Sequence, residues 1–399
     1  AIAIMDKFFV KSDNLCSKQV QKAIDDSFDR LLAPSIESEI RASLKEKSDL
    51  NSIKVFAENL SQLLFEPPYL AHEMIMGIDP GIRTGSKAVV LNNNGDLLEY
   101  FTLFIFNDSN KKSEANNLIN GIFKKYKIKT IAIGNGTGGR DTYDWIQSLQ
   151  IPELDIFLVN EAGASIYSAS EVAREEFPDL DLTYRGAVSI ARRLLDPLSE
   201  LVKIDPKSIG VGQYQHDVNQ NLLKENLDQT VISVVNRVGV NLNTASKHLL
   251  QYVSGIGPVL AKNIINYRSE KGKINNRKEL LKVKGLGPKA FEQAAGFLRI
   301  PESDQQLDNS SVHPERYDLV QKIAEDLGVN IKNLIGNQEL ISKINLQNYI
   351  QSDLGLPTLT DIVNELKKPG RDPRGEKNNF KYNDAIKEIT DLKVGMVLE

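Results

Sequence analysis

The stretch MIMGIDPGIRTGSKAVVLNNNGDLLEYFTLF, residues 74–104, decides the fold of the central part of the chain. It predicts three strands, at residues 74–79, 87–91 and 97–104, because each short apolar run is bounded by glycine or asparagine. Residues 92–95 are typical of the tight turn that joins the second strand to the third. The stretch therefore predicts three meandering strands.

Strands and helices alternate after this meander. The pattern predicts helices at residues 114–126, 141–149, 164–176 and 186–195, and strands at residues 130–133 and 156–159. Three meandering strands followed by such an alternation predict a mixed sheet that is covered by helices.

The segments on both sides read as helical. Apolar residues recur at helical spacing within residues 1–66, where one helix is expected to end before Pro34 and another before Pro67. Helices are also expected between residues 222 and 298 and between residues 314 and 366. Residues 367–375 are a polar linker rich in proline and glycine.

Composition limits the class of protein. The chain has 399 residues, of which 41% are hydrophobic and 26% charged, so two to four soluble domains are expected. The longest apolar runs fall short of the roughly 18 residues that span a membrane. The single cysteine, Cys16, excludes an internal disulfide framework and a cysteine zinc site. We expect a cytoplasmic monomer that is not bound to a membrane.

Two segments repeat one glycine pattern thirty residues apart. They are VSGIGP at residues 253–258 and VKGLGP at residues 283–288. Glycines allow a tight turn, the apolar residue between them anchors it, and proline suits the first turn of a helix. The free amides then face outward, toward a phosphate oxygen. This duplicated helix-hairpin-helix pattern predicts contacts to the nucleic-acid backbone, which carry no sequence information. The expected binding residues are Gly255, Gly257, Lys262, Lys284, Gly285, Gly287 and Lys289.

The charge distribution favours binding over a plain turn between helices. The formal net charge is −4, yet residues 247–299 hold eleven Lys and Arg against three Glu. Such a basic window attracts phosphate even within an acidic chain. A structural turn is the alternative, since glycine ends many helices, and one of the two hairpins can serve packing or protein contacts alone.

Three acidic residues stand at the ends of predicted elements. Asp79 ends the first strand, Glu161 follows the fifth strand, and Asp196 ends the helix of residues 186–195. In this order of strands and helices, a ribonuclease-H-like fold places its metal-binding carboxylates at such positions. Three carboxylates can hold Mg²⁺, and a pair of ions supports phosphodiester hydrolysis. Asp79, Glu161 and Asp196 are therefore candidate catalytic and metal-binding residues.

Structural roles compete with this interpretation. Asp79 can cap the glycine turn, Glu161 can cap the next helix, and Asp196 precedes a proline at a helix end. The fourth strand leads to Asn135, a neutral and poor metal ligand, where a nuclease needs a carboxylate. The glycine-rich loop of residues 134–139 can instead hold a phosphate. We therefore favour a binding protein without a required cofactor, and keep a Mg²⁺-dependent nuclease as the alternative.

Several segments together resemble the Tex family of bacterial transcription accessory proteins. The resemblance is specific and covers essentially the whole chain. The segments that carry it are residues 77–81 (GIDPG), 83–85, 133–137, 160–168, 185–197, 204–218, 292–299, 312–315 and 368–374.

The resemblance implies a fold class and a domain order. The fold class is multidomain α/β plus all-α, with a ribonuclease-H-like mixed sheet, helical flanks and tandem helix-hairpin-helix motifs. It also implies that a helix-turn-helix module before residue 1 is missing. The lack of an initiator Met and the alternating strand at residues 392–399, with no partner after it, favour an excised segment. The implied order is the end of an N-terminal helical region (1–70), a YqgF-type ribonuclease-H-like domain (71–220), a tandem helix-hairpin-helix domain (221–302), a small helical domain (303–370), and a linker with the first strand, residues 394–399, of an OB-fold RNA-binding domain (371–399).

The resemblance also implies a function. It implies a transcription accessory protein that binds RNA or DNA without sequence preference and acts as a scaffold for RNA polymerase or other transcription and translation machinery. The competing hypothesis is a Mg²⁺-dependent nuclease that uses Asp79, Glu161 and Asp196. A third hypothesis is a protein-interaction platform whose acidic surface docks such partners.

Overall fold

The computed structural model describes residues 1–69, 74–106, 109–351 and 354–375, and the single residues Lys377, Lys393 and Met396. The strand expected at residues 394–399 lies outside the described residues, except for Met396. The domain boundaries expected from the sequence stay predictions. The chain divides into two compact units, one of Ala1–Asn59 and Val211–Leu227 and the other of Leu60–Gly210 and Asp228–Glu399.

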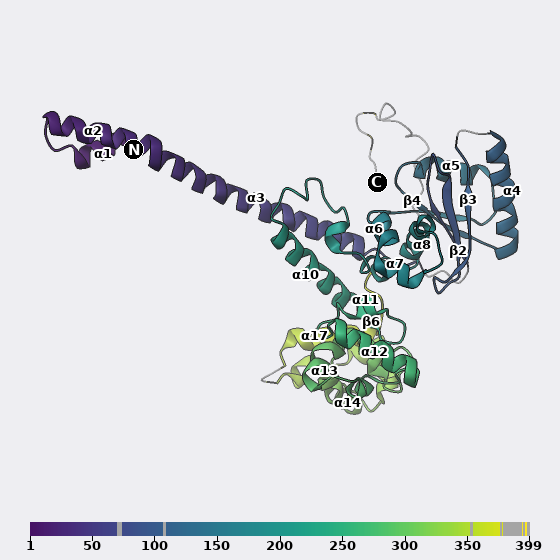
Figure 1. Ribbon diagram of the computed structural model, residues 1–399. Coiled ribbons are helices and arrows are strands. Elements are labelled where there is room, and N and C mark those ends of the chain that lie inside the picture. Colours follow the sequence, from purple (N-terminus) through teal and green to yellow (C-terminus); the bar gives the residue numbers. More distant parts are fainter. Residues whose placement is uncertain are drawn as a thin grey trace. The chain divides into compact units, whose positions relative to one another are not determined.

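The first unit begins with an almost continuous run of helix. Its elements are α1 (Ile2–Phe9), α2 (Leu15–Ser27), a π-helical turn (Phe28–Leu32) and the start of the long helix α3 (Ala33–Leu64), drawn in purple in Figure 1. The prediction that a helix ends before Pro34 was wrong. The amide of Ala33 donates to the carbonyl of Phe28, and this wide turn gives the proline ring the room that a regular helix lacks.

The rest of the first unit packs along α3. The Nζ of Lys45 donates to the carbonyl of Asp217 at 3.0 Å, and the Nδ2 of Asn59 donates to the carbonyl of Val211 at 2.7 Å. Residues 211–227 therefore belong with the helix rather than with the sheet that precedes them in the chain. The helix α10 (Gln220–Val238) begins in this segment.

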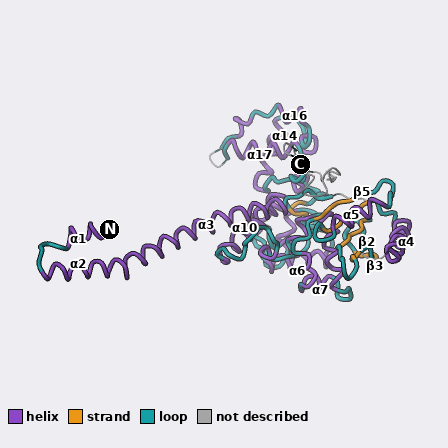
Figure 2. Tube along the Cα trace, turned by 90° about the horizontal axis from the view of Figure 1, so that it is seen from above, coloured by secondary structure: helices purple, strands orange, loops and turns teal. Residues whose placement is uncertain are grey.

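The second unit contains a five-stranded mixed sheet, as predicted, with its strands drawn in orange in Figure 2. The strands lie in the order β3-β2-β1-β4-β5. The first three pair antiparallel, whereas β4 pairs parallel with β1 and β5 parallel with β4. The strands are β1 (Ile75–Asp79), β2 (Ser86–Leu91), β3 (Leu97–Leu103), β4 (Thr130–Gly134) and β5 (Asp155–Val159).

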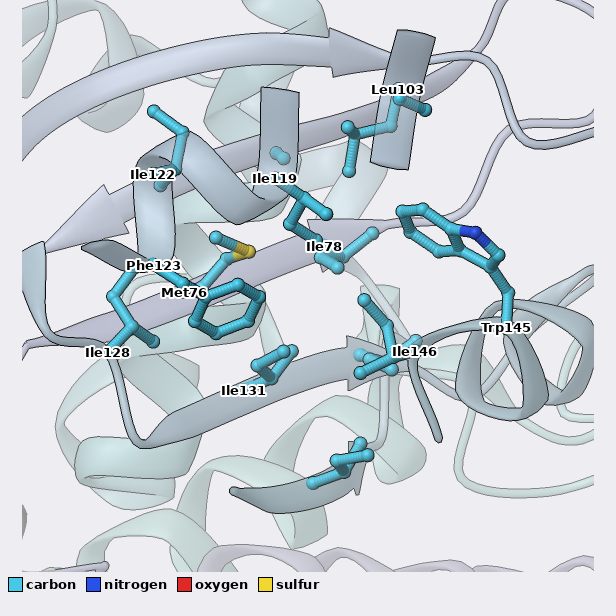
Figure 3. Close-up of a cluster of buried hydrophobic side chains, with 14 of the residues drawn as sticks. Met76, Ile78, Leu103, Ile119, Ile122, Phe123, Ile128, Ile131, Trp145 and Ile146 are labelled. Carbon is cyan, nitrogen blue, oxygen red and sulfur yellow. The ribbon is translucent and has the colours of Figure 1, made fainter. Parts of the chain in front are cut away.

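One face of the sheet is covered by α4 (Ser109–Tyr126) and α5 (Gly139–Ser148). Figure 3 shows the core between them, where Met76 and Ile78 of β1 meet side chains of both helices. Alternate residues of a strand point to opposite faces, so Ile75 contributes to the other core. Both faces of β1 are therefore buried.

The other face is covered by α6 (Ala164–Ala169) and α8 (Leu182–Leu195). The helix α8 lies very close to the sheet because β1 carries Gly77 at the crossing. A Cβ at Gly77 would lie 2.5 Å from the carbonyl oxygen of Ala187 and 2.7 Å from the Cβ of Ala191. This approach brings the start of α8 to the end of β1, where Asp79 stands.

The remaining part of the second unit is helical, as predicted. Two short parallel strands tie the hairpin region together at its ends, and a third hydrophobic core lies within residues 307–366. The elements are β6 (Val240–Asn241), α11 (Lys247–Leu250), α12 (Pro258–Lys271), α13 (Pro288–Ala294), β7 (Leu298–Arg299), α14 (Tyr317–Asp326), α15 (Ile331–Leu334), α16 (Gln338–Ser342) and α17 (Leu356–Lys367).

Candidate functional site

The two glycine hairpins have the same backbone conformation. We call residues 253–258 hairpin one and residues 283–288 hairpin two. Gly255 and Gly285 have φ of 81° and 82°, in the left-handed region that favours glycine. Between the glycines, Ile256 and Leu286 are 2% and 3% exposed. The apolar residue of each hairpin therefore anchors it in the core, as the sequence predicted.

The hairpins pack on each other's helices. A Cβ at Gly255 would lie 2.8 Å from the Cβ of Gln293 and 3.0 Å from the carbonyl oxygen of Ala290, both on α13. Gly285 faces Leu260 on α12. Each hairpin thus faces the helix that follows the other one, which is the exchange that a local twofold relation produces.

Hairpin two presents free donors and positive charge. Among the described residues, the backbone amides of Lys284, Gly285 and Gly287 have no hydrogen-bond acceptor. Lys284 and Lys289 are exposed beside them, and a Cβ at Gly287 would meet no atom within 4 Å. Consecutive free amides with flanking lysines form a concave site for an anion. Lys262 on α12 is also exposed.

The structure brings Asp79 and Glu161 together. Asp79 faces Gly186 of α8, where a Cβ would lie 2.6 Å from its Oδ2. The Glu161 carboxylate rests on the glycine-rich loop, and a Cβ at Gly136 would overlap it. Burial and, to a smaller extent, the negative charge of Glu161 together raise the pKa of Asp79 to about 6, against the opposing charge of Lys87.

Asp196 does not join this pair. It follows the end of α8, ten residues beyond Gly186, which is about 15 Å along a helix. Its carboxylate caps α9 (Pro197–Leu201), where it accepts from the amide of Leu198 at 3.1 Å and the Oγ of Ser199 at 2.7 Å. It also forms an ion pair with Arg374 at 2.6 Å. The capping role weighed against the metal role is therefore the one that the structure has.

The predicted three-carboxylate metal site is thus not formed. Across the described ranges, no three Asp, Glu, His or Cys side chains are grouped closely enough to hold a metal ion. The side chain of Glu161 does not cap the next helix either, because Gly163 holds that position without a side-chain cap. Asp79 and Glu161 remain candidates as a pair only.

Two residues that support Glu161 were not among the predicted site residues. Arg193 is 2% exposed and donates to the carbonyls of Asn160 and Ala162, at 2.8 and 2.7 Å, on both sides of Glu161. The Oδ1 of Asn135 accepts from the Glu161 amide at 3.3 Å. The neutral Asn135 therefore orients the loop of Glu161 through this hydrogen bond. Burial lowers the pKa of Arg193 to about 10.

A signal for the buried arginine existed in the sequence. Arg185, Ser189 and Arg193 are spaced by four residues, so they share one face of α8. All three are buried. The spacing alone does not reveal which face of a helix meets the sheet, so it does not predict that these side chains are buried.

The mixed sheet and the paired hairpins define a class: a ribonuclease-H-like domain joined to helix-hairpin-helix domains. The comparison with family models agrees with this architecture. Residues 73–195 match the Tex protein YqgF-like domain, residues 235–299 the helix-hairpin-helix motif, and residues 305–374 the HHH domain. The chain belongs to the Tex family.

Named relatives extend this result. Over 369 residues, 92% of this chain and 48% of the relative, the chain is 49% identical to the transcriptional accessory protein Tex of Neisseria gonorrhoeae. Over 368 residues, 91% of this chain and 47% of the relative, it is 46% identical to protein YhgF of Escherichia coli K12. In an alignment of 451 positions that covers 96% of this chain and 44% of the relative, it is 34% identical to the human S1 RNA-binding domain-containing protein 1. The chain spans about half the length of the curated relatives it matches.

None of the helices in the described residues is long and apolar enough to cross a membrane.

Proposed function

We propose that the chain binds nucleic acid through phosphate contacts at its hairpins and acts as an accessory scaffold in transcription. The observation that carries the proposal is hairpin two. Its amides at Lys284, Gly285 and Gly287 lack an acceptor in the described part of the chain, and exposed lysines flank them. Amide and lysine donors of this kind bind phosphate oxygens.

Binding of this type is tolerant of sequence. Phosphate contacts position a protein on a strand but do not read base edges, so RNA and DNA of any sequence are expected to bind. Each phosphate that a lysine neutralises releases counterions, which makes the affinity fall with salt. The role in transcription is proposed from the Neisseria gonorrhoeae relative, which is named a transcriptional accessory protein. A cytoplasmic monomer that docks RNA polymerase or other transcription or translation machinery completes the proposal.

The test replaces the two lysines of hairpin two. The double change Lys284→Gln and Lys289→Gln is compared with the wild-type chain by fluorescence anisotropy, on probes of about 20 nucleotides, between about 50 and 200 mM salt. The magnitude of the slope of log K against log salt is expected to fall by about 1.4 to 1.8, since two phosphate contacts are lost. Lys271→Gln, an exposed lysine at the far end of α12, is the matched control. An unchanged slope in the double variant would refute the assignment of hairpin two.

The partner is tested separately. The chain is used to capture RNA polymerase from purified components, with and without nuclease treatment. Capture that survives nuclease treatment supports a direct docking role. Capture that disappears indicates that the two proteins only share a nucleic acid.

Cleavage is not assigned to the carboxylate pair. The residues present do not fit the predicted site of two ions, because Asp196 is engaged with Arg374 and the cap of α9, whereas Asn135 is neutral. The nuclease alternative predicts Mg²⁺- or Mn²⁺-dependent cleavage of RNA, DNA or junction probes that disappears in Asp79→Asn. That result would replace the scaffold proposal for this domain.

A further inference from the structure

The two hairpins share a backbone but carry opposite side-chain chemistry. With the offset of thirty residues, Lys282, Lys284 and Lys289 of hairpin two correspond to Tyr252, Ser254 and Val259 of hairpin one. The three lysines are exposed. Val259, the residue of hairpin one that corresponds to Lys289, is also exposed, at 73%. Hairpin one therefore lacks the positive charges that hairpin two offers to a phosphate.

The backbone of hairpin one is also less available. The amide of Ser254 donates to the Oδ1 of Asn236 at 3.1 Å, and the Nδ2 of Asn236 donates to the Oγ of Ser254 at 2.7 Å. This pair of bonds fastens hairpin one to α10. The corresponding amide, that of Lys284, has no acceptor among the residues that the structure describes. One of the amides that hairpin two offers to a phosphate is thus already used in hairpin one.

Hairpin one borders a groove of about 650 Å³ instead. Two partly buried aromatic rings, Tyr252 and Phe297, line it together with the apolar side chains of Ile232 and Ile256. Gln293 of α13 adds an amide at the rim. We call this surface the hairpin-one groove. Apolar walls with a few polar groups at the edge match a flat ring system that carries hydrogen-bonding atoms on its rim.

The groove continues the basic surface of hairpin two. Lys289 and Gln293 are four residues apart on α13, so they lie on one face of the helix, about 6 Å apart along its axis. A phosphate at Lys289 is therefore within one nucleotide's reach of the rim at Gln293. The strand that hairpin two holds by its backbone can place a neighbouring base in the groove.

We propose that the hairpin-one groove takes a nucleobase that has left the base stack, from the strand whose phosphates hairpin two holds. Bases stack on aromatic side chains whatever their identity, so the groove keeps the binding tolerant of sequence. The chain then prefers single strands and frayed ends to closed duplex, in which every base is stacked and paired. This inference rests on the proposed function, because hairpin two must hold the strand.

The test compares probes that differ only in their bases. A single-stranded DNA of about 20 nucleotides is paired with an abasic strand of the same length and the same number of phosphates. Wild type is expected to bind the normal strand roughly tenfold more tightly, which corresponds to one stacked base. Tyr252→Leu removes a ring and keeps the apolar volume, and is expected to abolish this preference while affinity for the abasic strand stays unchanged. Tyr267→Leu, a tyrosine of α12 outside the groove lining, is the matched control and keeps the preference.

A second variant protects the test against misfolding. Gln293→Ala changes only an exposed side chain at the rim and is expected to reduce the preference severalfold. Equal binding of both probes by wild type, or an undiminished preference in a folded Tyr252→Leu chain, overturns the groove. The double lysine variant of hairpin two is expected to weaken both probes alike. If wild type shows no salt-sensitive affinity for either probe, the proposed function fails instead.

Discussion

Replacing Arg277 with methionine is expected to destabilise the joint between the hairpin region and the helices that follow it. Arg277 is 1% exposed, and its guanidinium donates to the carbonyls of Leu298, Ser310 and Val312 and to the hydroxyl of Tyr317. Methionine fills similar space but donates no hydrogen bond. The variant therefore leaves three carbonyl groups that lose a buried donor.

The expected loss follows from these contacts. Each buried acceptor left without a partner costs about 1–3 kcal/mol. Asp308 is also buried, and it accepts from the Arg277 amide at 2.9 Å and from the Tyr317 hydroxyl at 2.7 Å. Its charge loses the facing guanidinium, and the removal of one member of a buried ionic network costs about 3–5 kcal/mol. Partial relaxation of the carbonyls brings both estimates to about 4 kcal/mol.

Hydrogen exchange measures this loss where it occurs. Amides of residues 298–326 that exchange through opening are expected to exchange roughly 10³-fold faster in Arg277→Met, which is the factor that corresponds to about 4 kcal/mol. Arg277→Lys keeps a charge without the forked donors, so its amides are expected to be intermediate. Lys278→Gln changes the exposed neighbour and serves as the control. Acceleration below about tenfold in Arg277→Met would refute the reasoning.

Two further predictions concern the carboxylate pair and the hairpins. The pKa of Asp79 is raised to about 6 in the folded chain, so the contribution of its protonated carboxyl to stability is fully present below the unfolded pKa and is lost as the pH rises through 6. In thermal melts followed by circular dichroism, Asp79→Asn is therefore expected to melt at a higher temperature than wild type at pH 8. At pH 4 the two chains are expected to melt at similar temperatures. Gly255→Ala and Gly285→Ala each place a side chain at φ near 80°, which costs about 1–2 kcal/mol. Only the Cβ at Gly255 also crowds α13, at 2.8 Å from Gln293, so Gly255→Ala is expected to melt below Gly285→Ala; equal melting temperatures would contradict the packing of hairpin one.

The sequence predicted those parts of the fold that depend on residues close together in the chain, such as strands, tight turns and helix caps. The three meandering strands, which include the strand of Gly77 and Asp79, could be predicted because short apolar runs are bounded by glycine or asparagine. Both hairpins were visible because only glycine suits the left-handed dihedral angles found at Gly255 and Gly285. The helix expected at residues 164–176 divides into α6 and α7 (Glu171–Glu176), since the Ser170 side chain caps a new start. Serine favours a cap over a helix interior, so the break at Ser170 could have been predicted from the sequence.

The candidate site was less predictable because it depends on distances between elements. Asp79 and Glu161 meet because the parallel strands β1, β4 and β5 all end at one edge of the sheet, which strand order alone suggests. Asp196 does not reach Asp79 and Glu161 because it lies at the end of α8, about 15 Å along the helix from Gly186. No local sequence pattern predicts that Arg374, which is distant in the chain, forms an ion pair with Asp196. Long-range ion pairs of this kind need the three-dimensional structure.

The duplicated hairpins separate what glycine determines from what the other positions determine. The glycines give Gly255 and Gly285 the same φ within one degree, so a repeat in sequence correctly predicts a repeat in backbone. The proposed function follows the positions that differ, because the binding of a phosphate needs charge and free amides. Hairpin two has exposed lysines at Lys284 and Lys289, and the Lys284 amide has no acceptor among the described residues, whereas the Ser254 amide donates to Asn236. A hairpin that has the same turn but no lysines can still border a neighbouring groove, as hairpin one does. The sequence repeat therefore predicts two equal turns, and only their flanking residues and contacts predict two unequal binding sites.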